Sequence, residues 1–286
     1  MKNYLLVLFF LSQIFAQYDQ VFVGSRPLSM GGAFSAVADD ANAIVWNPAG
    51  LPGLRRTEFT STFTDLYDLG INHSYIGFVR PFSDQIAIGF DWSNIGFDDK
   101  ELGYSENKLN FSIGIQPHKI FSVGLNVKYL MRDMLLNETS YGKSNGIGRD
   151  LGVIIRPSKN VKMGLGVYDI GGTSVSYKDR TEETILGQAF RLGISYMPIN
   201  GLTLAADFSD RLHLGAEYIL GSRVSFRAGL QQGLNSNNEK DVLIPSAGMS
   251  LKFKSIVMEY GFESHPYLNP THRFTIALQL SPAVVS

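Results

Sequence analysis

From Thr57 to near the end of the chain, apolar residues alternate with polar or small residues almost without interruption. In the segment 161–168, for example, every second residue is Val, Met or Leu, and Lys, Gly or Tyr lies between them. Successive side chains of a β-strand point to opposite faces, so this pattern predicts strands that each have one complete apolar face. About 14 such segments can be counted, most of them close to the 9–11 residues that a tilted strand needs to cross a membrane. They lie near residues 57–65, 72–80, 84–94, 106–116, 120–132, 146–156, 161–170, 188–197, 202–209, 211–219, 223–231, 244–253, 255–263 and 271–280.

The connections between these segments alternate in length. Those that follow even-numbered strands are short (81–83, 117–119, 157–160, 198–201, 221–222 and 254), and four of these six begin with proline, which ends strand pairing. Most of those that follow odd-numbered strands are long (95–105, 133–145, 171–187, 232–243 and 264–270). Short turns on one side and long loops on the other are typical of outer-membrane barrels, whose short turns face the periplasm. The sequence therefore predicts an all-β protein, an antiparallel transmembrane β-barrel in the bacterial cell outer membrane.

A soluble β-sandwich is the competing interpretation, because its strands also alternate. A sandwich has short edge strands marked by charge, whereas here the apolar face is complete on nearly every strand. Charged residues make up only 18% of the chain, and the second face is rich in glycine rather than in lysine and glutamate. Aromatic residues near strand ends also favour an interfacial girdle in a barrel: Tyr75, Trp92, Tyr129, Tyr168, Tyr196, Tyr218 and Tyr260.

If the apolar face meets outer-membrane lipid, the glycine-rich face lines the lumen. Glycine leaves space, so either the lumen is open or another part of the chain fills it. These glycines are Gly89, Gly114, Gly124, Gly164, Gly166, Gly193, Gly215, Gly229, Gly248 and Gly261. The other predicted lumen residues are polar: Asp91, Lys128, Arg191, Asp207, Glu217, Arg227, Lys252, Glu259 and Arg273. Both signs of charge occur among them, which favours buried pairs over a ring that selects one kind of ion.

The N-terminus resembles a secretory signal peptide. Lys2 precedes an apolar core from Tyr4 to Phe10, and Ala16 suits the residue before a cleavage site. The next residue is Gln17 rather than cysteine, so the signal is not that of a lipoprotein. We therefore divide the chain into a signal peptide (1–16), a plug segment (17–56) and a barrel (57–286).

Residues 22–56 do not alternate like strands. The run from Met30 to Val37 is small and apolar and is suited to close packing. Asp39 or Asp40 can cap a short helix over residues 41–46, which Asn47-Pro48 would end and Gly50 would follow with a turn. A compact plug of short helices and turns is expected, which could occupy the lumen. Its predicted gate residues are Arg26, Met30, Gly31, Gly32, Asp39, Asp40, Asn42, Trp46, Asn47, Pro48 and Gly50.

The plug sequence SRPLSMGGAFSAVADDANAIVWNPAGL, residues 25–51, is similar to the N-terminal signature of FadL-like outer-membrane proteins, and especially to the PorV/PorQ family branch. The elements ADDANA (38–43) and WNPAGL (46–51) carry most of the match. This resemblance implies an N-terminal hatch inside the barrel and passage of hydrophobic small molecules, such as long-chain fatty acids or aromatic hydrocarbons, with a lateral exit through the wall. The loops of such proteins build a capture groove, and loop 95–105 has few apolar residues for one.

Several other kinds of chemistry lack their residues. There is no cysteine, and the net charge of −1 gives no electrostatic case for nucleic acid. The five histidines have no metal-ligand spacing. Ser144 lacks the histidine two residues before it that outer-membrane phospholipases use, and Gly164 and Gly166 lack the third glycine of a dinucleotide site. We expect no catalysis, no metal and no cofactor.

Three functions remain open. The first is a passive transporter for hydrophobic small molecules, gated by the plug. The second is a PorV/PorQ-like scaffold that binds proteins of a type IX secretion system. The third is a structural barrel with a sealed lumen.

Overall fold

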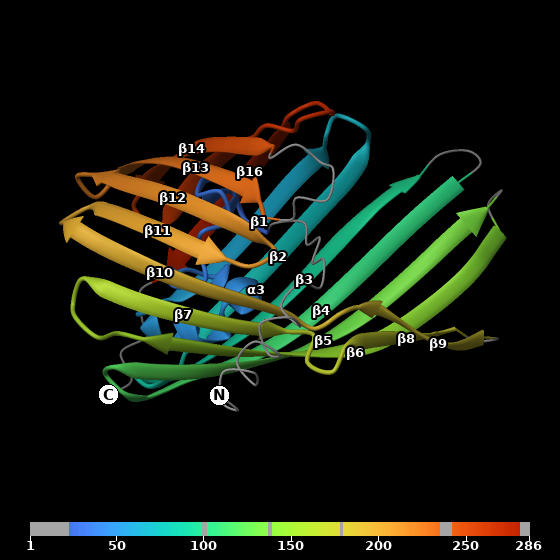
Figure 1. Ribbon diagram of the computed structural model, residues 1–286, viewed down its shortest axis with the longest axis horizontal. Helices are drawn as coiled ribbons and strands as arrows, with labels where there is room; N and C mark the ends of the chain where they lie inside the picture. Colours follow the sequence, from blue (N-terminus) through green and yellow to red (C-terminus); the bar gives the residue numbers. More distant parts are fainter. Residues whose placement is uncertain (1–22, 99–101, 137–138, 178–179, 235–241, 281–286) are drawn as a thin grey trace, which may run out of the picture.

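The computed structural model describes residues 23–98, 102–136, 139–177, 180–234 and 242–280. The expected signal peptide, residues 1–16, lies outside this part of the chain. In the described part of the chain, sixteen strands form one sheet, and their pairings are antiparallel. Fourteen of them close into a barrel, because β1 pairs with β16 and β5 pairs with β6. The barrel confirms the predicted fold class (Figure 1).

The barrel strands closely follow the predicted segments. They are β1 (Thr57–Leu66), β2 (Ile71–Pro81), β3 (Ile86–Asp98), β4 (Leu102–His118), β5 (Phe121–Leu136), β6 (Thr139–Ile155), β7 (Val161–Tyr168), β10 (Ala189–Ile199), β11 (Leu202–Phe208), β12 (Arg211–Leu220), β13 (Val224–Gly233), β14 (Leu243–Phe253), β15 (Ile256–Glu263) and β16 (Thr271–Leu280). The turns that follow β2, β4, β6, β10, β12 and β14 are short and lie together at what we call the short-turn end of the barrel.

Three of the predicted long loops are largely strand, and this part of the prediction was wrong. The segments 95–105 and 133–145 extend β3 to β6, and 171–187 contains a hairpin of β8 (Thr173–Tyr177) and β9 (Arg180–Leu186). The reason is pairing between neighbours: β3 and β4 stay in register as far as Asp98↔Gly103, and β8 pairs with β6 at Gly146↔Val175. We call the resulting extension the arm: residues 95–98, 102–106, 132–136 and 139–145, with β8 and β9. Figure 1 shows it projecting past the other strands.

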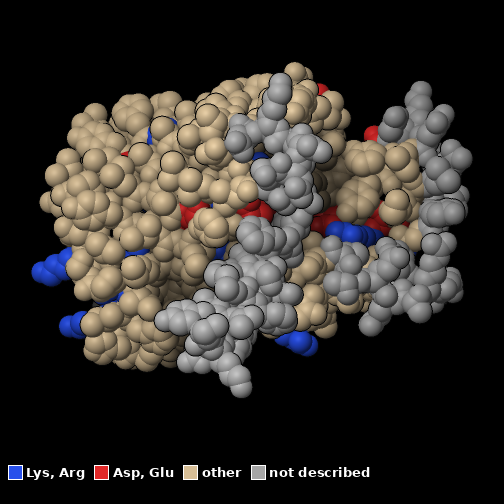
Figure 2. Space-filling model, in the orientation of Figure 1, with Lys and Arg blue, Asp and Glu red and all other residues tan. Residues whose placement is uncertain are grey.

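The apolar side chains of the strands point outward and the polar side chains point inward, the opposite of a soluble protein. Phe63 and Ile276 are 54% and 60% exposed on the outer face, whereas Thr62 and Thr275 beside them are buried. Burial of apolar area from water favours folding, so an outer face of this kind is stable in lipid and unstable in water. Uncharged residues correspondingly cover most of the coloured surface in Figure 2, and the charged residues lie in separate patches. The fold is therefore a transmembrane β-barrel.

Two residues assigned to the aromatic girdle were placed wrongly. Tyr75 is fully buried and Tyr168 is 4% exposed, because both share the strand phase of inward residues. Tyr129, Tyr196 and Tyr218 are exposed on the outer face, as expected of a girdle.

The segment before β1 contains α2 (Ser25–Ser29), α3 (Ala43–Trp46) and the 3-10 helix η1 (Pro48–Gly53). These helices lie within the barrel (Figure 1), and most of their residues are buried. Helix α3 begins later than the predicted 41–46. The prediction that Asp39 or Asp40 caps this helix was wrong: its N-cap is Asn42, and no side chain caps it. Asp40 Oδ1 accepts a hydrogen bond from the Asn42 amide at 2.8 Å, and Asp39 binds Arg26. Among the described residues, no helix has the length and apolarity required of a membrane span.

Candidate functional site

Ten inward-facing glycines of the wall surround the segment 25–52, and we call them the glycine girdle. They are Gly89, Gly114, Gly124, Gly152, Gly164, Gly193, Gly215, Gly229, Gly248 and Gly261. A Cβ atom on Gly114 would come within 2.6 Å of the Pro48 carbonyl oxygen, and one on Gly215 within 2.6 Å of the Met30 carbonyl oxygen. The space left by missing side chains is thus occupied by the backbone of the N-terminal segment. Nine of the ten were assigned to the lumen from the sequence, and Gly166 instead faces the Tyr168 hydroxyl.

The interior of this segment is an apolar cluster that includes Met30, Phe34, Ile44 and Leu51, all fully buried. Phe34 meets Trp46 edge to face, with 5.9 Å between ring centroids. The Trp46 indole N–H donates to the Val23 carbonyl oxygen at 3.0 Å. This packing gives the segment a core of its own inside the barrel.

Side chains of the wall hold the backbone of the segment. Asp207 Oδ2 accepts from the amides of Phe34 and Ser35 at 3.1 and 2.9 Å. Arg191 donates to the Gly32 carbonyl oxygen at 2.9 Å, and its guanidinium lies 4.9 Å from the Trp46 ring centroid. These contacts satisfy backbone groups that no helix or strand pairs.

The wall also stabilises two irregular points of the segment. They are the turn at Gly31 and Gly32, and the end of helix α3 at Asn47. The Gly31 amide donates to Ser246 Oγ at 3.0 Å, and both glycines have positive φ angles of 61° and 77°, which favour glycine. The Asn47 amide group donates to the Val153 carbonyl oxygen at 3.2 Å. Asn47 Oδ1 also accepts from the Ala49 amide, so this residue begins η1 ahead of Pro48.

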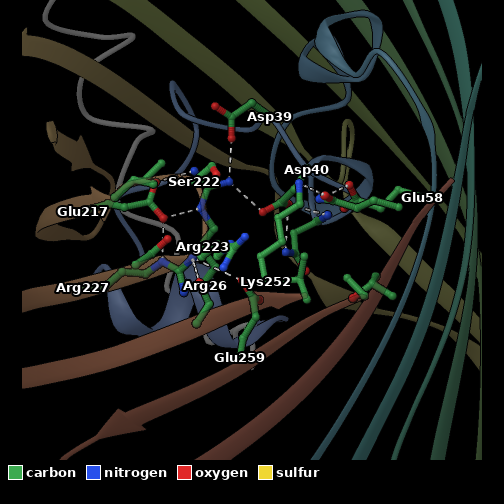
Figure 3. Close-up of a pocket in the computed structure, with 18 of the residues that line it drawn as sticks. Arg26, Asp39, Asp40, Glu58, Glu217, Ser222, Arg223, Arg227, Lys252 and Glu259 are labelled. Atoms are coloured by element: carbon green, nitrogen blue, oxygen red, sulfur yellow. Dashed lines mark hydrogen bonds and ion pairs between the residues drawn. The ribbon is translucent and has the colours of Figure 1, made fainter. Parts of the chain in front are cut away.

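Six charged residues join the segment to β12, β13 and β15, and we call them the ionic latch: Arg26, Asp39, Asp40, Glu217, Arg227 and Glu259 (Figure 3). Arg26 donates to both Glu217 oxygens, at 2.9 and 2.6 Å, and to Asp39 and Asp40 at 2.6 and 2.9 Å. Arg227 in turn reaches Glu217 at 2.7 Å and Glu259 at 3.2 Å.

Arg26 and Asp39 stabilise each other's charged form. Burial raises the pKa of the Asp39 carboxyl, but the nearby Arg26 and Lys162 charges outweigh this effect and lower that pKa to about 2. Burial likewise disfavours the Arg26 cation, and the surrounding carboxylates nevertheless hold its pKa above the ordinary value.

A pocket with a volume of about 290 Å³ lies beside the latch and opens at the short-turn end. Besides the latch it is lined by Arg56, Glu58, Arg223 and Lys252, among others (Figure 3). Glu58 is buried and accepts from the Ala41 amide at 2.9 Å and from Gln279 at 3.1 Å. About half of the residues that line the pocket are charged, so it does not suit a purely apolar ligand.

A second polar network crosses β3 to β6 on the other side of the girdle. Asn110 donates to Asp91 at 2.7 Å, and Asn126 donates to Asp150 at 2.8 Å. Lys128 pairs with Asp150 at 2.8 Å and with Asp169 at 2.9 Å, and all three residues are buried. The lumen wall above the girdle is thus polar, as predicted for Asp91 and Lys128.

Part of the inner face of the arm is apolar, and it lies next to the ion pair that Glu106 and Arg132 form at 2.6 Å on the same strand phase. We call it the rim patch: Ile95, Phe97, Leu102, Tyr104 and Met134. These residues share the strand phase of buried Asp91, Asn110 and Lys128, and the pairings Phe97↔Tyr104 and Tyr104↔Met134 place three of them side by side. The Phe97 and Tyr104 rings stack with 6.2 Å between centroids. From the sequence, segment 95–105 has few apolar residues for a capture groove. Because most of the segment is strand, these few residues all point to the same face.

The structure brings together most of the residues singled out from the sequence. Arg273 stands apart and donates to Thr64 Oγ1 at 2.9 Å, whereas Lys252 donates to Gln279 at 2.8 Å and lines the pocket beside the latch. Three further polar residues of the lumen were not predicted from the sequence: Glu58, Asp150 and Asp169. Glu58 and Asp150 lie in predicted strands on the inward phase, so the alternation was a signal for both, whereas Asp169 lies at a strand end where no pattern indicates a direction.

No family model matches the chain, and no curated protein matches its sequence. Solved structures with a similar fold include the CymD monoaromatic hydrocarbon channel (TM-score 0.70, 15% identity, covering 93% of this chain and 99% of that one). The Ralstonia pickettii toluene transporter TbuX (0.63, 14%, 90% and 98%) and the Pseudomonas putida toluene transporter TodX (0.64, 11%, 93% and 98%) are also similar. The resemblance to the PorV/PorQ branch rests on the plug motif alone. The chain therefore has the barrel fold of the FadL-type hydrocarbon channels.

Proposed function

We propose that this protein is a transporter of the bacterial outer membrane that takes up small hydrophobic molecules, with the N-terminal segment as its plug and gate. The rim patch is the observation that carries the proposal, because it places an apolar surface on the inner face of the arm, at the end opposite the short turns. Transfer of apolar area out of water contributes about 25 cal/mol per Å². Such a surface would concentrate a hydrocarbon at the mouth of the barrel. The similarity of the fold to monoaromatic hydrocarbon channels supports the same substrate class.

The route beyond the rim patch differs from a simple pore. The glycine girdle encloses the plug closely, and β2, β3 and β4 are paired without a register shift, so no lateral gap lies between these strands. Passage therefore requires the plug to move. The proposed gate elements are Asp39, Asp40, Trp46, Asn47 and Pro48, which hold the plug in its present position.

Replacing Phe97 and Met134 with aspartate should lower the initial rate of toluene uptake by about tenfold. Two carboxylates on the rim patch would remove its affinity for an apolar solute. Uptake of radiolabelled toluene by cells that carry the barrel at equal density measures the effect. Lys143→Asp, on the exposed outer face of the same arm, is the matched control and should leave uptake unchanged. Equal uptake by wild type and the double variant would contradict a role for the rim patch in capture.

Deleting residues 22–56 should raise the ion conductance of the barrel at least several-fold in planar bilayers, because the lumen glycines would then face water. A deletion barrel that conducts no better than the full chain would contradict the gate. If the protein is instead a PorV/PorQ-like secretion scaffold, toluene uptake should be the same in wild type, in the deletion and in the rim-patch variants.

A further inference from the structure

The short-turn end of the barrel carries a surplus of positive charge around the plug. Six cations line the pockets at this end, and we call them the cation ring: Arg55, Arg56, Arg156, Lys162, Arg223 and Lys252. The only exposed carboxylates that pair with them among the described residues are Asp39 and Asp84. Basic side chains also project from this end of the molecule in Figure 2.

Most of the ring is not neutralised. Arg55 pairs with Asp84 at 2.6 Å, but both side chains are largely exposed, so the pair is weak. Lys162 lies 3.6 Å from Asp39. Arg156 donates to the hydroxyl of Ser122, and Lys252 donates to the amide of Gln279; neither partner carries charge.

Arg56 and Arg223 make no ion pair with any residue in the described part of the chain. Among the described residues, four cations of the ring therefore make no ion pair.

The carboxylates deeper in the pocket do not offset this surplus at the mouth. Glu217 and Glu259 are bound by Arg26 and Arg227, and Glu58 accepts two hydrogen bonds. Arg227 has a further feature: its Nη1 is buried and has no hydrogen-bond acceptor. That atom has no accessible surface, so the pocket presents the cations at its mouth rather than this N–H (Figure 3).

We propose that this face docks an acidic polypeptide segment of a periplasmic partner protein, with one carboxylate of that segment entering the mouth of the pocket beside Arg223 and Lys252. A volume of about 290 Å³ is large enough for an acidic side chain. Complementary charge steers such a partner and fixes its position. This inference does not depend on the proposed transport activity.

The position of the ring favours a protein over lipid headgroups. The pocket-lining cations surround the plug within the circumference of the barrel, so the wall separates them from the bilayer. Other cations at the same end face outward: Arg80 lies 5.6 Å from the centroid of the Phe82 ring, and Lys254 lies 5.6 Å from that of Phe253, both exposed apolar residues. Those are the cations placed to meet headgroups.

The test uses the full-length barrel in nanodiscs of zwitterionic lipid and a fluorescent oligoglutamate peptide, with an oligoglutamine peptide of equal length for comparison. Fluorescence anisotropy should show binding of the first and not of the second, weakened about tenfold between roughly 50 and 300 mM salt because exposed charges are screened. The double variant Arg223→Glu and Lys252→Glu should lose at least tenfold in affinity. Lys254→Glu, a charge reversal at the same end but facing outward, should bind like wild type.

Several results would overturn the proposal. They are equal binding of the glutamine peptide, no binding at low salt, or an equal loss in Lys254→Glu. Inorganic phosphate that competes at micromolar concentration would identify a small-anion site instead. Binding only to vesicles of phosphatidylglycerol would assign the charges to lipid. The electrophoretic mobility of unheated samples shows whether each variant is folded, and Ser222→Glu beside Arg223 provides a second, milder change of charge at the pocket, with a smaller loss expected.

Discussion

A barrel that carries both Gly124→Val and Gly229→Val is expected to conduct ions far better than wild type, because its plug no longer fits. A Cβ at Gly124 would overlap the backbone of Pro48 and Ala49, and one at Gly229 would overlap the backbone of Met30 and Gly31. Backbone atoms cannot turn aside as the end of a flexible side chain does. Overpacking of this kind costs about 1–3 kcal/mol at each site. Since the two sites lie on opposite parts of the plug, a shift that relieves one does not relieve the other.

Single-channel recording and limited proteolysis of the plug measure this effect. Gly233→Val is the matched control, because a Cβ there has nothing within 4 Å, and it should conduct like wild type. Gly124→Ala alone should give a smaller change in the same direction. A double valine variant with wild-type conductance and an intact, protease-resistant plug would show that the girdle does not hold the plug in place.

Arg26→Met is expected to weaken the attachment of the plug more than any other single substitution in the latch. Glu217 is 2% exposed and would lose two of its charge-assisted hydrogen bonds, and Asp39 and Asp40 would lose their shared partner. Removing one member of a buried ion pair typically costs about 3–5 kcal/mol, because the other charge stays buried without compensation. Arg26→Lys should recover only part of this loss, because one ammonium cannot reproduce the forked contact with both Glu217 oxygens.

Hydrogen exchange of the plug amides, followed by mass spectrometry, reports the change directly. Exchange should accelerate in Arg26→Met by the factor that corresponds to the lost free energy. The control is Arg55→Met, which breaks an exposed pair with Asp84 worth about 0–1 kcal/mol. Equal exchange in Arg26→Met and Arg55→Met would mean that the latch contributes little to plug stability.

What the sequence by itself determined is the set of features that depend on neighbouring residues. Alternation located the barrel strands and identified which face meets lipid, since Phe63 and Thr62 can only point in opposite directions along one strand. Pro81, Pro117, Pro157 and Pro198 marked four of the short turns for a local reason, the missing backbone donor. The alternation within β2 also predicts the position of Tyr75, because Tyr75 is separated by an even number of residues from the inward-facing residues of that strand.

Only the tertiary structure decided which residues far apart in sequence meet. Arg26 and Glu217 are separated by 191 positions, and no periodicity within either segment indicates the other. Asp39 and Asp40, expected from the sequence to cap a helix, both bind Arg26 instead. The arm forms because backbone pairing continues wherever an adjacent strand supplies donors and acceptors. The sequence of one strand alone therefore does not predict how far the pairing extends. Side-chain direction is set within a few residues by the geometry of the chain, whereas partners are chosen by closure of the whole barrel.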